Sequence, residues 1–304
     1  MDEKRHEYTR EQLKKLQETN LSMAVLFFRF CKENHLTAYL CGGGCIGAIR
    51  HKGFIPWDDD LDFFMPREDY EIFLEKWKDY KSGGELALSV SDKESIDHNL
   101  FATLRHKKTT CIKPYQKNLD LVHGVPLDIL PLDGYPDSKW QRKKQCFWAL
   151  IYSLFCAQTV PENHGKLMAF GSRLLLGVFR GKKFRYRIWS LAKRKMTKYR
   201  IQDCKGITEL CSGPGYMKNR YDKEWFSSYL EVPFENQVLP IPVGYDAYLR
   251  KVFGDYTKLP PKEKQQTPHD CIFVDLDTPY TAYKGIYYLT GKEREKEDGT
   301  DTGS

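Results

Sequence analysis

The sequence predicts an α+β protein: a mixed sheet flanked by helices, with a basic helical region inserted into the chain. Short apolar runs bounded by Gly and Pro alternate with amphipathic helical stretches up to about residue 135. Residues 139–200 have helical character throughout. The 304 residues are 41% hydrophobic and 29% charged, a balance typical of globular proteins that excludes wholesale disorder.

The first elements follow from periodicity. A long helix is expected over residues 11–33, where leucine, valine and phenylalanine recur at helical spacing among lysines and glutamates. We expect a strand over 37–41, a turn at glycines 42–44 and a helix over 45–51. The acidic run that starts at residue 58 is predicted to form one strand ending at residue 65.

The later elements are shorter. Pro66 and the acids after it favour a helix that runs to about residue 80, and strands are expected over 86–91, 102–105 and 125–130. We therefore divide the chain into a catalytic core (1–138), a basic helical region (139–205), a C-terminal part that completes the core (206–290) and a disordered tail (291–304).

Charge is unevenly distributed. The chain carries 48 Lys and Arg against 41 Asp and Glu, a net charge of +7. Residues 139–200 hold 16 of the basic residues and one acid, so this region carries +15 and the remainder −8. Apolar stretches flanked by Lys and Arg suit an anionic membrane surface, nucleic-acid phosphates or simply a solvated basic face. Nucleic acid is not expected as a partner.

The nine cysteines are scattered, odd in number and without a Cys-x-x-Cys pair, which indicates reduced thiols in a cytoplasmic protein. A nucleophilic Cys45 is the alternative, but no histidine is placed by sequence to activate it. The N-terminus is too charged for a secretory signal, and the longest uncharged stretch, 145–161, is too short to span a membrane. A peripheral position at the inner face of the membrane remains open.

Asp58, Asp60 and Asp62 would share one face of the predicted strand, because side chains alternate along a strand. Three carboxylates on one face repel each other, and a divalent metal is the usual compensation. Their oxygens suit Mg²⁺ or Mn²⁺ rather than Zn²⁺. The competing interpretation is a solvated acidic loop, but acids interleaved with Leu61 and Phe63 favour the metal.

The glycine turn at 42–44 opens a helix, so its amides offer a phosphate site at Gly42, Gly43 and Gly44. Arg50 and Lys52 could neutralise further phosphate oxygens or be ordinary surface charges. Farther along, Asp128 is the only charge in an apolar strand. It is expected to be a further metal ligand, a base for an acceptor hydroxyl, or a buried paired carboxylate.

Together these motifs resemble the nucleotidyltransferase superfamily. The strings 42–62, 65–73 and 125–134 resemble the LicD family of phosphocholine transferases, to which fukutin and fukutin-related protein are distantly similar. Further matches occur at 248–249, 253–256 and 260–261. Gly44 departs from the family, which more often has Thr there.

The resemblance implies a nucleotidyltransferase-like fold and a phosphotransferase that uses a CDP-alcohol donor, most often CDP-choline, with Mg²⁺ or Mn²⁺. The acceptor would be a sugar of a surface glycan, such as teichoic acid or lipopolysaccharide, or of its lipid-linked precursor. Carried over to this chain, Asp58, Asp60, Asp62 and Asp128 would hold the metal, with Asp60, Asp62 and Asp128 catalytic, and the glycines would bind the diphosphate.

Other residues are candidate substrate contacts: Trp57, Arg67 and His269. A cage for the choline ammonium could draw on Tyr115, Tyr135, Tyr245 and Tyr248. Two other functions remain open. One is a nucleotidyltransferase that uses CTP or another nucleoside triphosphate, and the other is a non-enzymatic membrane scaffold.

Overall fold

The computed structural model describes residues 6–158, 166–267 and 271–291. Its main sheet has seven strands, and five of them run in the order β1-β2-β6-β4-β3. These are β1 (Tyr39–Leu40), β2 (Asp62–Pro66), β6 (Pro126–Tyr135), β4 (Ala102–His106) and β3 (Leu86–Ser89). The strands β7 (Gly206–Glu209) and β8 (Tyr221–Asp222) extend the sheet from the second half of β6. The predicted α+β architecture with a mixed sheet is confirmed.

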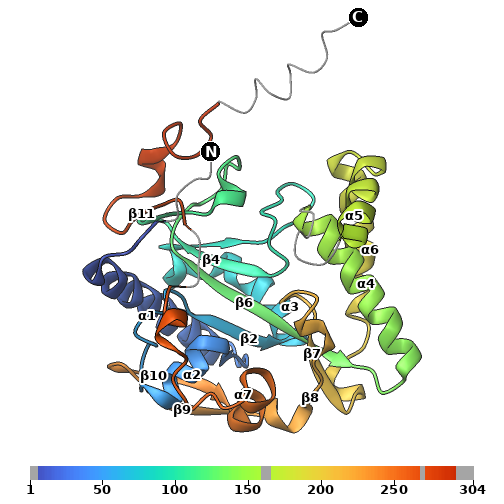
Figure 1. Cartoon of the computed structure of the whole chain (residues 1–304), viewed down its shortest axis with the longest axis horizontal. Helices are drawn as coiled ribbons and strands as arrows, with labels where there is room; N and C mark the ends of the chain where they lie inside the picture. The colour runs from blue at the N-terminus through green and yellow to red at the C-terminus, as the bar shows by residue number, and fades with distance from the viewer. Residues whose placement is uncertain (1–5, 159–165, 268–270, 292–304) are drawn as a thin grey trace, which may run out of the picture.

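Two small sheets flank the main one. Strands β9 (Tyr229–Phe234) and β10 (Gln237–Pro242) form a hairpin, and β5 (Thr110–Ile112) pairs with β11 (Phe273–Asp275). The helices that lie along the sheet in Figure 1 are α1 (Arg10–Glu33), α2 (Gly42–Arg50), α3 (Arg67–Lys76) and α7 (Tyr245–Phe253). A capping box between Thr9 and Gln12 opens α1, whose apolar side packs into the main hydrophobic core.

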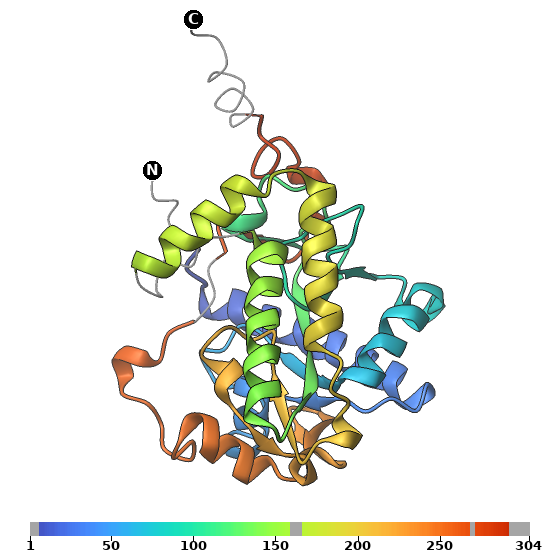
Figure 2. The ribbon, with the colours of Figure 1, turned by 90° about the vertical axis from the view of Figure 1, so that its right-hand side faces the viewer.

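The basic region folds as three helices, α4 (Lys139–Ala157), α5 (Lys166–Val178) and α6 (Lys182–Met196). They gather on one side of the sheet in Figure 1, and Figure 2 shows α4 and α6 side by side with α5 crossing above them. A second hydrophobic cluster, which includes Tyr152, Phe155 and Trp189, packs between them. The expected helical character of residues 139–200 is therefore confirmed where the structure describes them.

Three predicted elements need correction. The strand expected from residue 58 begins only at Asp62, because that is where β6 starts to run beside it. The predicted glycine turn is the first turn of α2, which starts at Gly42 with a φ of +50°. The strand expected to stop before Pro131 continues to Tyr135, where β7 pairs with it. The predicted disordered tail lies outside the described residues from position 292 on.

Candidate active site

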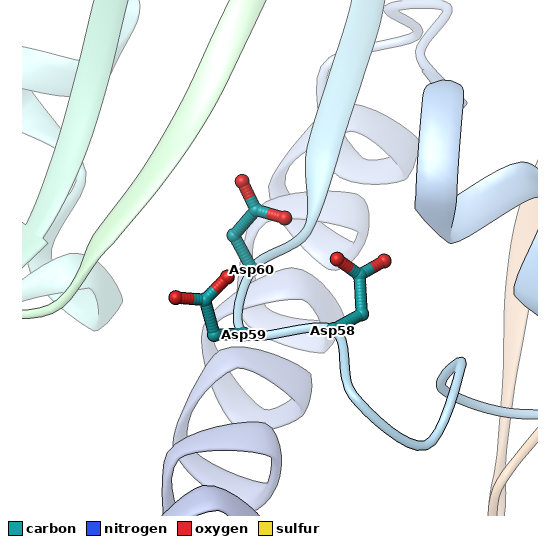
Figure 3. A group of neighbouring side chains, drawn as sticks. All are labelled: Asp58, Asp59 and Asp60. Atoms are coloured by element: carbon teal, nitrogen blue, oxygen red, sulfur yellow. The ribbon is translucent and has the colours of Figure 1, made fainter. Parts of the chain in front are cut away.

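The acidic loop before β2 is held against α1. The amide of Asn20 donates to the Asp59 carbonyl at 3.0 Å, and that of Gln17 donates to the Asp58 carbonyl at 2.8 Å. Carboxylate oxygens of Asp58, Asp59 and Asp60 lie within 4.8 Å of one another. In Figure 3, Asp60 lies between the other two. This spacing would suit one cation. The three residues lie in a loop, however, and not in the strand that we expected from the sequence.

Strand register brings the two remaining acids together. Asp62 on β2 is the direct partner of Asp128 on the parallel strand β6, so their side chains lie on the same face of the sheet. On the other side of β6, Thr103 of β4 is the partner of Asp128, and its hydroxyl donates to Asp128 Oδ1 at 2.7 Å. Asn99 donates to the Thr103 hydroxyl at 3.1 Å. This chain of hydrogen bonds orients the Asp128 carboxylate.

A cavity of about 890 Å³ opens over this face of the sheet. Asp60, Asp62, Asp128 and Gly42 all line it, whereas Asp58 does not. The remaining walls are mostly aromatic or polar and include Phe64, Phe101, Lys113, Tyr115, Glu209, Tyr216, Tyr248 and Phe253. The structure thus brings three of the four predicted metal ligands to one cavity, and their role as ligands stays a prediction.

Lys113 forms an ion pair with this acidic group. Its Nζ lies 3.9 Å from Asp128 Oδ2, and its side chain is only 13% exposed. Burial alone would lower the pKa of Lys113, but the Asp128 carboxylate outweighs it, so the pKa rises above its usual value. The lysine therefore stays charged at neutral pH and can neutralise an anion that enters the cavity.

The predicted phosphate site at the start of α2 is partly filled by the protein. The Gly42 N–H donates to the Tyr248 hydroxyl at 3.1 Å. At Gly43 an added Cβ would lie 2.2 Å from Asp58 Oδ2, so the Asp58 carboxylate lies directly against the helix N-terminus. The positive end of the helix favours that charge. Gly44 packs against Leu40 and Leu61, where a Cβ would already be tight.

Arg50 and Lys52 lie outside the lining of the cavity. Arg50 Nη1 donates to the carbonyls of Tyr256 and Lys258 at 2.8 and 3.0 Å, so it ties α2 to the segment after α7. Lys52 is exposed in a left-handed conformation with φ of +58°. Both observations favour structural or surface roles over contact with the diphosphate.

The predicted substrate contacts are distributed as follows. Trp57 packs partly buried against the main core. Arg67 forms a buried ion pair with Asp133, and both bonds measure 2.8 Å. His269 lies outside the described residues. Of the aromatic side chains considered for an ammonium cage, Tyr115 and Tyr248 line the cavity, whereas Tyr135 lies under the Arg142 guanidinium.

The nucleophilic alternative for Cys45 finds no support. The side chain is fully buried, and burial raises the pKa of its thiol far above the usual range. A thiol in this state carries almost no thiolate at neutral pH, and the thiolate is the reactive form.

Sequence reasoning missed Lys113 and Glu209, which line this cavity, and Thr103, which is buried behind it and orients Asp128. Glu209 is 3% exposed, and burial raises the pKa of its carboxyl. It is a lone acid beside apolar residues, which is the same signal that pointed to Asp128. No such signal marks Thr103 or Lys113, because their role depends on strands that meet only in the fold.

Among the described residues, no helix combines the length and hydropathy needed to cross a membrane.

Comparison with known proteins agrees with this geometry. Residues 35–146 match the family described as "LicD/FKTN/FKRP, nucleotidyltransferase domain". The chain is 27% identical over 258 residues to the lipopolysaccharide cholinephosphotransferase LicD of Haemophilus influenzae, which covers 82% of this chain and 92% of the relative. An uncharacterised protein of Rickettsia typhi is 26% identical over 107 residues, which covers 35% of this chain and 32% of that protein.

Proposed function

Because residues 35–146 match the LicD nucleotidyltransferase domain, we propose that this chain is a transferase that moves phosphocholine onto a sugar hydroxyl of a surface glycan. By analogy with the lipopolysaccharide cholinephosphotransferase of Haemophilus influenzae, the acceptor is a lipopolysaccharide. The donor that we propose is CDP-choline, and the acceptor sugar can also belong to a lipid-linked precursor. The observation that carries the proposal is the pairing of Asp62 with Asp128 in a cavity that Asp60 also lines.

The residues present fit a divalent metal of the Mg²⁺ or Mn²⁺ type. Asp60, Asp62 and Asp128 offer carboxylate oxygens only, which is the donor set that these hard cations prefer. When bound, the ion would neutralise the donor's diphosphate and stabilise the leaving CMP. Asp58 can add a ligand only if it leaves Gly43, so we assign it to holding the acidic loop against α2.

The protein's own contribution is positioning and charge. Thr103 and Lys113 hold the Asp128 carboxylate from two sides, which fixes its orientation toward the cavity. Lys113 also provides a permanent positive charge for the donor phosphates. The acceptor hydroxyl oxygen attacks the phosphorus that carries choline, the bond from that phosphorus to CMP breaks, and the hydroxyl proton passes to a base, for which the Asp128 carboxylate is the candidate. Holding both reactants in line supplies much of the rate enhancement.

The first test is ligand-induced thermal stabilisation. CDP-choline, CDP-glycerol, CDP-ribitol, CDP-ethanolamine and CTP are compared, each with and without Mg²⁺ or Mn²⁺. A metal-dependent shift with CDP-choline is expected. A shift with CTP alone would favour a nucleotidyltransferase instead, and no shift with any of them would favour a non-enzymatic scaffold.

The second test is turnover, measured as CMP release from CDP-choline. Asp62→Asn and Asp128→Asn are each expected to slow it by about 10²-fold or more, by analogy with the loss of a group that stabilises the transition state. Asp79→Asn, a change of the same kind at an exposed position outside the cavity, is the matched control. The melting temperature of Asp62→Asn should stay within a few degrees, because removing this carboxylate relieves repulsion. Asp128→Asn should also lower the melting temperature, because it leaves the buried Lys113 charge without its carboxylate. Insoluble Asp62→Asn protein would contradict the proposal.

We further propose that the basic helical region lies on an anionic membrane surface, close to a lipid-linked acceptor. Along α5, Phe170, Leu174 and Val178 are 67%, 56% and 64% exposed and follow each other at four-residue spacing, so they form one apolar stripe. Arg173 and Arg180 are exposed on the same segment. Apolar side chains beside arginines are typical of interfacial helices.

Vesicle flotation tests this second proposal. Binding is expected with phosphatidylglycerol vesicles and not with phosphatidylcholine vesicles, and about 0.5 M salt should weaken it by screening. Leu174→Ser should weaken it as well, whereas Leu259→Ser, at a similarly exposed leucine outside the region, should not. Equal binding to both vesicle types would refute the electrostatic part of the proposal.

A further inference from the structure

The end of the cavity away from Asp128 is built around a buried glutamate. Glu209 on β7 is the partner of Leu132 on β6, four residues beyond Asp128. Four residues is an even number, so Glu209 lies on the same face of the sheet as Asp62 and Asp128. Along the strand the two levels are separated by about 13 Å. A phosphate group and a short alcohol can therefore lie between the acidic cluster and Glu209.

Aromatic rings surround this carboxylate. The hydroxyl of Tyr221 donates a hydrogen bond to Glu209 and so orients it. Tyr216 lines the same cavity as Glu209, and its pKa is raised first by burial and second by the Glu209 charge. Tyr248 also lines this cavity and packs against Phe64 with ring centres 5.8 Å apart.

The exposed fractions of the side chains around Glu209 indicate which of them a ligand in the cavity can contact. Tyr216 and Phe253 are both 41% exposed and line the cavity, so each offers ring surface to a ligand. Glu209 itself is 3% exposed and takes part in hydrogen bonds, but within the described residues it has no ion-pair partner. Burial disfavours the charge of the Glu209 carboxylate, so a cation bound beside it and beside the ring faces would stabilise that charge.

We propose that Glu209, Tyr216 and Phe253 form the recognition site for a quaternary ammonium group, so that this end of the cavity selects a choline donor. The inference rests on the proposed function and deepens it by naming the residues that choose the alcohol. A trimethylammonium group cannot donate hydrogen bonds, and its charge is stabilised by a carboxylate and by ring faces. Glycerol and ribitol carry no positive charge, so they would leave the buried Glu209 carboxylate without a counter-charge.

Calorimetric titration with three ligands in the presence of Mg²⁺ tests the inference. The ligands are CDP-choline, CDP, and the CDP ester of 3,3-dimethylbutanol, which has the shape of choline without its charge. The unmodified protein should bind CDP-choline at least about tenfold more tightly than the uncharged ester, as expected for loss of a desolvated ammonium contact. CDP reports on the nucleotide and diphosphate part alone.

Glu209→Gln should abolish the preference for CDP-choline over the uncharged ester and leave the affinity for CDP unchanged. Glu75→Gln, at an exposed glutamate on α3, is the matched control and should behave like the unmodified protein. If Glu209→Gln does not fold, Tyr216→Leu serves as the second test, because losing this exposed ring should weaken the same preference for CDP-choline over the uncharged ester.

The outcomes separate the two proposals. If the unmodified protein prefers CDP-choline and both variants keep that preference, the ammonium site is refuted while the transferase proposal stands. If CDP-ribitol or CTP stabilises the unmodified protein in the thermal test and CDP-choline does not, the proposed function itself fails. Equal loss of CDP and CDP-choline affinity in Glu209→Gln would also refute the inference, because it would indicate a general defect of the cavity.

Discussion

Replacement of Asp133 by asparagine should destabilise this protein strongly. Asp133 is fully buried on β6, and Arg67, at the start of α3, has a side chain only 9% exposed. Arg67 Nε and Nη2 donate to the two carboxylate oxygens, each at 2.8 Å. Burial alone would lower the pKa of Arg67, but Asp133 outweighs it and raises the pKa well above the usual value. The guanidinium therefore remains charged in the folded state.

The size of the effect follows from this burial. Asp133→Asn would leave a buried guanidinium whose remaining carboxylate is Glu71 at 3.4 Å, and Glu71 is itself 47% exposed. Breaking a buried ion pair by removing one partner costs about 3–5 kcal/mol. For 304 residues the entropy of unfolding is about 0.6 kcal/mol/K, so the melting temperature should fall by about 5–8 °C.

Urea denaturation followed by circular dichroism, together with calorimetry, measures the change. Asp222→Asn is the control, because its pair with Arg220 is exposed and should contribute less than about 1 kcal/mol. The double variant Arg67→Met/Asp133→Leu should be more stable than Asp133→Asn, since it leaves no buried charge unpaired. An Asp133→Asn protein within about 1 kcal/mol of the original would refute this reasoning. A fully stable but inactive Arg67→Met would instead support the substrate contact that the sequence indicated.

Two further predictions concern the glycine helix and acid stability. Gly43→Ala should displace the Asp58 carboxylate and lower both stability, by about 1–3 kcal/mol, and turnover, whereas Gly171→Ala, whose Cβ has open space in α5, should be neutral or stabilising. Unchanged turnover and stability in Gly43→Ala would contradict the close approach. Burial lowers the pKa of His123 to about 4, below its unfolded value near 6.5, so its contribution is complete above pH 6.5 and is lost as the pH falls toward 4. The free energies of unfolding from urea denaturation at pH 7.5 and 4.5 should differ by about 2–3 kcal/mol more in the original protein than in His123→Gln, and equal pH dependence would exclude this role.

The local sequence pattern was sufficient to predict part of the fold and part of the cavity lining. The helix from Arg10 to Glu33 follows directly from apolar side chains at helical spacing and from its polar caps. Asp128 stands out because a lone carboxylate in an apolar strand requires a partner, and Lys113 and Thr103 are the partners observed. The resemblance that rests on residues 42–62 and 125–134 agrees with the family match over 35–146.

The remaining parts of the fold depend on pairing between segments that are distant in the sequence. Asp58 to Asp60 look like a strand in the sequence, but a strand requires a neighbour for its backbone hydrogen bonds, and β6 runs beside the chain only from Asp62 on. α1 instead bonds the backbone of this loop through Gln17 and Asn20.

Charge partners depend on the same long-range geometry. The sequence indicated Arg67 as a candidate substrate contact, but it forms a buried ion pair because β6 brings Asp133, 66 residues away, next to it. Glu209 reaches the cavity of Asp62 and Asp128 only through the register of β7 on β6. Residue type and spacing thus determined which groups could bind a metal or phosphate. Tertiary structure decided which of them face one cavity, because burial and counter-charges come from parts of the chain that local pattern does not connect.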